Sequence, residues 1–189
     1  MVKLGFIVEG DTEKIILERT DFFSYLSSKE IAFVPEVLNA AGNGNLLPHN
    51  VEKHTRILEA KGATHIFTLT DIDEDNCITL TKNRISPQNN QTVIVSIKAI
   101  ESWFLADTES MKLFLNDDQF SQQDPENIIE PYEHIRTLRF TKTGRGISGK
   151  VILAKSLTNT YKFSIINAAK HPACSSARYF LDKIDKVAG

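Results

Sequence analysis

The chain alternates short β-prone apolar runs with amphipathic helical stretches, and this alternation limits its possible folds more than any other feature. Helical spacing at residues 14–28 and 51–61 follows the first and second runs. Parallel neighbouring strands need crossover connections, which helices normally supply. The sequence therefore predicts an α/β fold with a mainly parallel sheet flanked by helices. The expected strands are residues 4–8, 31–38, 64–70 and 92–97.

The pattern changes after the last expected strand. Residues 99–115 have helical spacing, and Trp103 within them is expected in the core rather than on a nucleic-acid stacking surface. A polar, acidic stretch follows, and the remainder is helix-rich with a basic loop. We expect residues 1–110 to form the α/β domain and residues 111–189 a helical C-terminal extension packed on it as one compact unit.

Composition and charge narrow the class of protein. The hydrophobic fraction of 41% and the charged fraction of 24% are ordinary for a globular protein. No run approaches the roughly 18 apolar residues of a membrane span, and no export signal is visible, so we expect a cytoplasmic protein without a membrane partner. Cys77 and Cys174 are too few for a disulfide framework. The net charge of −2 means that nucleic-acid binding needs a local basic patch or a bound metal.

Three carboxylates follow expected strands: Glu9 comes after the first, and Asp71 and Asp73 come after the third. In open parallel sheets, sites form beyond the carboxyl ends of strands, so these side chains can share one site. Two aspartates separated by one extended residue project from the same side and can converge on Mg²⁺, a hard cation that prefers oxygen ligands. A solvated acidic loop and complementation of a helix dipole by Glu9 are the alternatives.

These residues form a family-like pattern. Glu9-Gly10-Asp11-Thr12-Glu13 after one strand and Thr70-Asp71-Ile72-Asp73 after another resemble the Toprim domain shared by topoisomerases, primases and overcoming-lysogenisation-defect (OLD) nucleases. The form V-E-G-x-T-E is closest to the OLD-like branch. The segment I-E-S-W-F-L-A-D at residues 100–107 resembles the bacterial Toprim-like family DUF4276. The resemblance covers roughly residues 3–107 through short motifs in matching order.

The resemblance implies a Toprim or Rossmann-like sheet carrying a metal-dependent nuclease site that acts on DNA or RNA. It implies that Glu9 acts in phosphoryl transfer while Asp71 and Asp73 ligate Mg²⁺ or Mn²⁺. Glu13 is a further catalytic candidate or merely a first-turn helix acid. Glu101 is a further metal ligand, a cap or a buried ion-pair partner. A separate ATPase subunit and a role in defence against phage or mobile elements are also implied.

A basic, glycine-rich segment follows much later in the chain. Its glycines let backbone amides approach phosphate oxygens, and its cations can steer a phosphate backbone. Lys142 or Lys150 could stabilise charge on a leaving group, so both are also catalytic candidates. Val151 stands where a P-loop requires serine or threonine, and a solvated surface loop is the alternative. The predicted phosphate-binding residues are Arg136, Arg139, Lys142, Arg145 and Lys150.

Two other functions stay open from the sequence. One is a non-catalytic Toprim-fold subunit that binds or regulates within an ATPase complex. The other is a phosphohydrolase acting on small nucleotides, which suits the acidic net charge. Scattered histidines without zinc-ligand spacing and the lack of a G-x-S-x-G elbow disfavour zinc and serine hydrolases. The sequence leaves the oligomeric state and the number of metal ions open.

Overall fold

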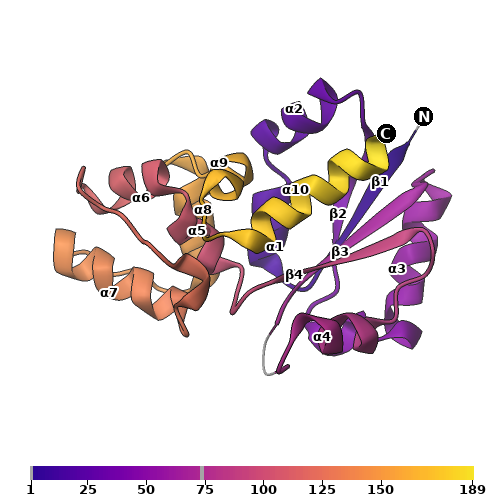
Figure 1. Ribbon diagram of the computed structural model, residues 1–189, viewed down its shortest axis with the longest axis horizontal. Coiled ribbons are helices and arrows are strands. Elements are labelled where there is room, and N and C mark those ends of the chain that lie inside the picture. Colours follow the sequence, from indigo (N-terminus) through magenta and orange to yellow (C-terminus); the bar gives the residue numbers. More distant parts are fainter. Residues whose placement is uncertain (1, 73–74) are drawn as a thin grey trace.

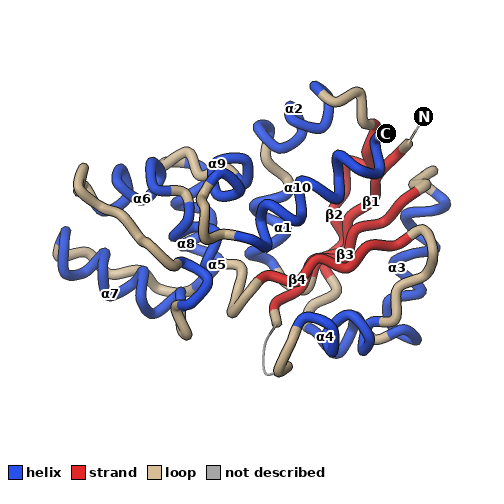
Figure 2. The backbone as a smooth tube through the Cα atoms, in the orientation of Figure 1, coloured by secondary structure: helices blue, strands red, loops and turns tan. Residues whose placement is uncertain are grey.

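The protein is an α/β structure built on one parallel sheet. The computed structural model describes residues 2–72 and 75–189. Within them, four strands pair in the order β2-β1-β3-β4, all parallel. Figure 2 shows the strands side by side as one sheet. This confirms the predicted fold class. The strands are β1 (Lys3–Val8), β2 (Ala32–Asn39), β3 (His65–Asp71) and β4 (Gln91–Ser96).

Helices flank the sheet and form a separate cluster beyond the carboxyl end of β4 (Figure 1). No helix in the described part of the chain is long and apolar enough to span a membrane. Short 3₁₀ turns occur at Asn43–Leu46 and Pro125–Asn127. The α-helices are α1 (Asp11–Leu17), α2 (Thr20–Ser28), α3 (Pro48–Ala60), α4 (Ile78–Ile85), α5 (Glu101–Ala106), α6 (Thr108–Leu115), α7 (Pro131–Thr143), α8 (Lys150–Asn159), α9 (Ile165–Lys170) and α10 (Ser175–Ala188).

Two helices that the sequence predicted as continuous are interrupted. The pattern over residues 14–28 is divided between α1 and α2, because Arg19 takes an extended backbone conformation. The pattern over residues 99–115 is divided between α5 and α6 at Asp107, whose carboxylate accepts a 3.2 Å hydrogen bond from the Ser110 amide. A capping side chain starts a new helix without disturbing the apolar spacing. Periodicity alone therefore did not reveal either break.

The two faces of the sheet have separate cores, because successive strand residues point to opposite sides. One face packs Phe6 and Phe67 against the ring of Phe180 on α10, at centroid distances of 6.5 Å and 5.9 Å. Trp103, fully buried as expected, stacks on the same ring at 5.9 Å. The opposite face carries a smaller core beneath α3 and α4, which includes Ile66. The C-terminal helix thus returns to the sheet that opens the chain.

The connection after β4 determines where the functional site lies. Helices α5 to α9 gather beyond the carboxyl end of the sheet, and α8 packs against α1 (Figure 1). The amino terminus of α8 and the start of α5 are thereby brought to the end of the sheet where β1 and β3 finish. Segments separated by about a hundred residues in sequence meet there. The domain boundary near residue 110 remains a prediction.

Candidate active site at the carboxyl edge of the sheet

Five carboxylates and one lysine line a single hollow beyond the carboxyl ends of β1 and β3. We call it the acidic hollow, and its volume is about 270 Å³. Its residues come from β3, α5, α8 and the connection from β1 into α1, so only the fold assembles it. The lining residues are Glu9, Gly10, Asp11, Thr12, Glu13, Asp71, Glu101, Lys150 and Val151.

Glu9 is held by the strand beside it. The parallel pairing of β1 with β3 places the end of β1 against the last residues of β3. Glu9 Oε2 accepts a 2.5 Å hydrogen bond from Thr70 Oγ1 and a 3.2 Å bond from the Asp71 amide. These bonds fix the direction of a half-buried carboxylate at the mouth of the hollow. The predicted proximity of Glu9 and Asp71 is therefore realised.

Asp71 is also oriented by two hydrogen bonds. Its Oδ1 accepts a hydrogen bond from Ser96 Oγ, directly opposite on β4, and a 2.8 Å bond from the Ile100 amide. Burial raises the pKa of Asp71 well above its ordinary value, the charge of Glu13 adds to the rise, and the Ser96 bond opposes it. Burial, with a smaller contribution from the neighbouring carboxylates, thus disfavours the ionised form of Asp71.

Glu13 lies in the first turn of α1, as one of the sequence alternatives held. Its Oε2 accepts a 3.1 Å hydrogen bond from the amide of Gly10, the residue that precedes this helix. The same side chain is 5% exposed and faces the hollow. Burial, followed by the charges of Glu9 and Glu101, raises the pKa of Glu13 to about 7 against lowering by backbone hydrogen bonds. A proton therefore exchanges on this carboxylate near neutral pH.

Glu101 is completely buried and only half satisfied. Its Oε2 accepts a 3.3 Å hydrogen bond from Lys150 Nζ, which makes it the buried ion-pair partner that the sequence allowed. Its Oε1 has no hydrogen-bond partner within residues 2–72 and 75–189. Burial lowers the pKa of Lys150, but the charges of Glu101 and Asp71 outweigh it and leave that pKa raised. A buried carboxylate oxygen without a donor is costly, so Glu101 is prepared for a further positive partner.

The remaining predicted residues are dispersed. Asp73 lies outside the described residues. Lys142 pairs with Asp117 at 2.8 Å, and Arg136 pairs with Glu133 at 3.0 Å. Arg145 is exposed in the loop before α8. Of the basic residues predicted to bind phosphate, only Lys150 lines the acidic hollow.

Arg139 has a packing role that argues against the predicted phosphate contact. The residue is 8% exposed, so a nucleic-acid backbone has little access to it. Its guanidinium lies 4.6 Å from the centroid of the Phe114 ring and donates a 3.3 Å hydrogen bond to Tyr161 Oη. An arginine stacked on aromatic rings in this way stabilises the helical cluster. Sequence reasoning grouped it with surface cations because local charge density does not report burial.

Sequence reasoning also missed residues that orient the acids. Ser96 aligns Asp71, and a hydroxyl at the end of the neighbouring strand was the available signal. Asp11 lines the rim of the hollow and accepts a 2.7 Å hydrogen bond from Asn39 Nδ2, at the end of β2. Both contacts depend on which strands are neighbours. That strand order was not predicted from the sequence.

The donor set of the hollow fits a hard divalent cation. Among residues 2–72 and 75–189, no three His, Cys, Asp or Glu side chains are already arranged around one ion position. Mg²⁺ does not require such a cage, since proteins usually hold it with one or two carboxylates while it keeps several waters. Glu101 offers an oxygen with no hydrogen-bond partner in the described chain, and a cation beside Asp71 would stabilise the ionised form that burial disfavours.

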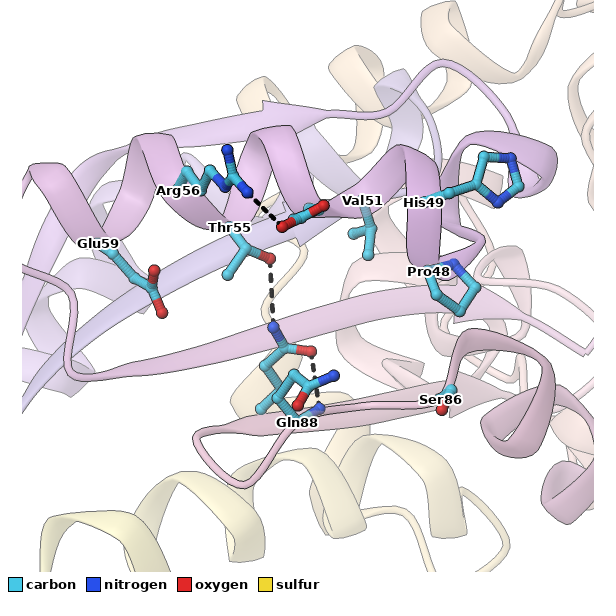
Figure 3. Close-up of a pocket in the computed structure, with 10 residues that line it drawn as sticks. Pro48, His49, Val51, Thr55, Arg56, Glu59, Ser86 and Gln88 are labelled. Atoms are coloured by element: carbon cyan, nitrogen blue, oxygen red, sulfur yellow. Dashed lines mark hydrogen bonds and ion pairs between the residues drawn. The ribbon is translucent and has the colours of Figure 1, made fainter.

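A larger hollow of about 480 Å³ lies between α3 and the segment that leads from α4 into β4 (Figure 3). Its polar groups bind one another: Arg56 pairs with Glu52, and Gln91 Nε2 donates a 3.2 Å hydrogen bond to Thr55 Oγ1. None of the sequence-predicted residues lines it. Despite its size, it is a weaker candidate site than the acidic hollow.

No family model and no curated protein matches this chain. Among solved structures, the chain is similar to the C-terminal region of the OLD protein of Xanthomonas campestris pv. campestris. The sequence identity is 15%, the alignment covers 98% of this chain and 95% of that one, and the TM-score is 0.37. A TM-score this low carries no argument about function. The case for a function therefore rests on the residues of the acidic hollow.

Proposed function

We propose that this protein is a Toprim-type nuclease, OLD-like and related to the DUF4276 family, that uses Mg²⁺ or Mn²⁺ to cleave phosphodiester bonds in DNA or RNA. The observation that carries the proposal is a buried Glu101 oxygen without a partner in the described chain, in a hollow that four further carboxylates line. Such an arrangement is unfavourable unless a cation completes it.

The carboxylates divide the work of holding the cation. Glu9, Asp71 and Glu101 would ligate it, and the sequence resemblance adds Asp73 as a further ligand. The bound cation would supply charge neutralisation at the phosphate and a lower pKa for the attacking water. The hydrogen bonds from Thr70 and Ser96 already hold two of these carboxylates in place, which reduces the ordering that binding requires.

The other wall of the hollow is suited to a phosphate. Lys150 is the first residue of α8 and Val151 is the second, and both line the hollow. The unsatisfied amides and positive dipole at a helix amino terminus favour an anion. Lys150 Nζ, 3.3 Å from Glu101, would orient a phosphate oxygen and stabilise charge on the leaving group.

Proton transfer is assigned to the two acids at the end of β1 and the start of α1. Glu9 would position or deprotonate the attacking water. Glu13, with its pKa raised to about 7, would exchange protons with solvent near neutral pH. A separate ATPase subunit and a role in defence against phage belong to the same proposal and rest on the sequence resemblance.

The test is cleavage of supercoiled, linear and single-stranded DNA and of RNA by the pure protein with Mg²⁺ or Mn²⁺. Glu9→Gln and Asp71→Asn should each slow cleavage at least about 1,000-fold, roughly 4 kcal/mol of transition-state stabilisation. Glu52→Gln, an exposed acid on α3, is the matched control and should cleave like the wild type.

Three outcomes would redirect the assignment. Equal cleavage by all the variants would place the activity outside the acidic hollow. Turnover of mononucleotides or dinucleotides but not polymers would indicate a small-nucleotide phosphohydrolase. Metal binding without cleavage of any substrate would indicate a subunit that binds or regulates within an ATPase complex.

A further inference from the structure

A second hollow adjoins the acidic hollow. Glu101 and Lys150 line both, so their ion pair stands at the boundary between the two spaces. The second hollow also includes Ala99 and residues 129–133 and has a volume of about 240 Å³. A group bound in it would lie directly beside whatever binds at Lys150. We call it the side hollow.

One wall of the side hollow is formed by Ile129 and Tyr132. Ile129 is 80% exposed, the highest value among the exposed large hydrophobic side chains of the described chain. Tyr132 Oη accepts a 2.7 Å hydrogen bond from the Gly149 amide and lies 3.4 Å from the Ile147 carbonyl. These contacts hold the Tyr132 ring and, through Gly149, the adjacent Lys150. The wall and the proposed phosphate ligand are thus positioned by the same contacts.

The rim of the side hollow has the opposite charge from Lys150. Glu130 and Glu133 both line it, and Glu133 is neutralised in part by Arg136 at 3.0 Å. Carboxylates repel a phosphate but accept hydrogen bonds from the exocyclic amino groups of cytosine, adenine and guanine. The charge pattern therefore suits a nucleotide whose phosphate lies at Lys150 and whose base points towards Glu130.

We propose that the side hollow binds one unpaired nucleobase of the substrate, next to the cleaved phosphodiester. This inference rests on the proposed function and deepens it by naming the substrate class as single-stranded nucleic acid or an extruded nucleotide. The volume is below the roughly 300–1,000 Å³ of drug-sized sites, which limits the occupant to one ring system. Ile129 and Tyr132 contact the faces and edge of the base, and the acidic rim excludes a second phosphate.

Binding is tested first, without cleavage, in the Glu9→Gln protein. A single abasic position is moved stepwise along a fluorescent single-stranded oligonucleotide, and affinity is measured by anisotropy. Loss of a base from an aromatic or apolar platform typically weakens binding by roughly 1–3 kcal/mol, so one abasic position should lower affinity about tenfold or more. In the wild-type protein, cleavage should occur beside that same position. A fully paired duplex should bind at least about tenfold more weakly than the single strand, because extruding its base costs a few kcal/mol.

Ile129→Ser provides the matching protein change. It should weaken binding of the intact oligonucleotide about tenfold and remove the effect of the abasic position. Ile57→Ser is the control, because Ile57 is 44% exposed on α3, which covers the opposite face of the sheet. This control should bind like the parent protein.

The outcomes separate the two proposals. An abasic effect that depends on Ile129, without cleavage by the wild type, supports the side hollow and overturns the nuclease assignment. Cleavage without any special abasic position, or with equal behaviour of Ile129→Ser and Ile57→Ser, overturns the side hollow and leaves the nuclease intact. Unchanged nucleic-acid binding by Ile129→Ser also overturns the proposed base site, even if that variant no longer binds a protein that the wild type binds.

Discussion

Two buried carboxylates in the helical part of the molecule have opposite surroundings. Glu126 accepts hydrogen bonds from the Ser175 amide and hydroxyl at 2.9 Å and 2.8 Å, and from the Ser176 amide and hydroxyl at 2.9 Å and 2.5 Å. Glu101, also buried, has one lysine partner and an oxygen without a partner in the described chain. Both acids are buried, but only Glu126 has hydrogen bonds to both of its carboxylate oxygens.

This difference separates a structural acid from a functional one. Glu126 caps the amino terminus of α10, where the helix dipole and free amides favour a negative charge. Burial, followed by the charge of Glu126, raises the pKa of the neighbouring Cys174 thiol to about 12, so that cysteine stays protonated. Glu101 has no such set of donors and lies beside other carboxylates. Of these two acids, only Glu101 has an oxygen that lacks a hydrogen-bond partner in the described chain.

The largest expected effect on stability comes from replacing Glu126. Replacing it by alanine leaves buried amide and hydroxyl donors unsatisfied, and Glu126→Ala should lower the free energy of unfolding by about 4 kcal/mol. Urea unfolding at pH 7 measures this. Glu101→Ala should cost much less, since it also removes an unsatisfied acceptor. Equal losses of unfolding free energy in the two variants would show that hydrogen bonding does not separate a structural acid from a functional one.

The next largest effect is the contribution of Glu13 to the pH dependence of the free energy of unfolding. Its folded pKa of about 7 exceeds its ordinary value of 4.5, so the folded protein retains a proton that the unfolded chain has lost. Stability from this group is therefore highest at acid pH and falls between pH 4.5 and 7, by on the order of 3 kcal/mol. Glu13→Gln should flatten this decline in urea unfolding from pH 5 to 8. A decline of unchanged steepness would place its cause elsewhere, for example at Asp71.

Added Mg²⁺ should distinguish Glu101 from Glu126 through its effect on the free energy of unfolding. Mg²⁺ at about one hundred times its dissociation constant should stabilise the wild-type protein by about 2.7 kcal/mol, because only the folded state assembles the site. Glu101→Gln should lose most of this gain, whereas Glu126→Gln should retain it. Unfolding curves with and without Mg²⁺ measure the difference for each protein. Equal stabilisation of both variants would show that the ion binds outside the acidic hollow.

The smallest effect concerns Lys150. Its side chain is 52% exposed, so solvent screens its pairing with Glu101. Lys150→Met should lower the free energy of unfolding by about 1 kcal/mol or less. The same variant should slow cleavage much more strongly, because its proposed role is at the phosphate. Unfolding and cleavage measured on one preparation decide between a structural and a chemical role.

Part of the site was predictable because strand ends and hydrogen-bond register follow from local sequence. The short apolar runs before Glu9 and Asp71 located both acids at carboxyl ends of strands, and parallel sheets bring such ends together. The place of Glu13 in the first turn of a helix was also among the predictions. By contrast, Arg139 and Lys150 looked equivalent in sequence, yet one is buried in packing and the other lines the acidic hollow.

The sequence by itself determined the α/β class and the positions of the acids that end β1 and β3, since both depend on patterns a few residues long. The tertiary structure alone decided that Glu101 is buried with no second partner in the described chain and that Lys150 lies beside it. Those properties require α8 to pack on α1 and α5 to follow β4. Burial and pairing depend on contacts between residues distant in sequence, which no local pattern encodes.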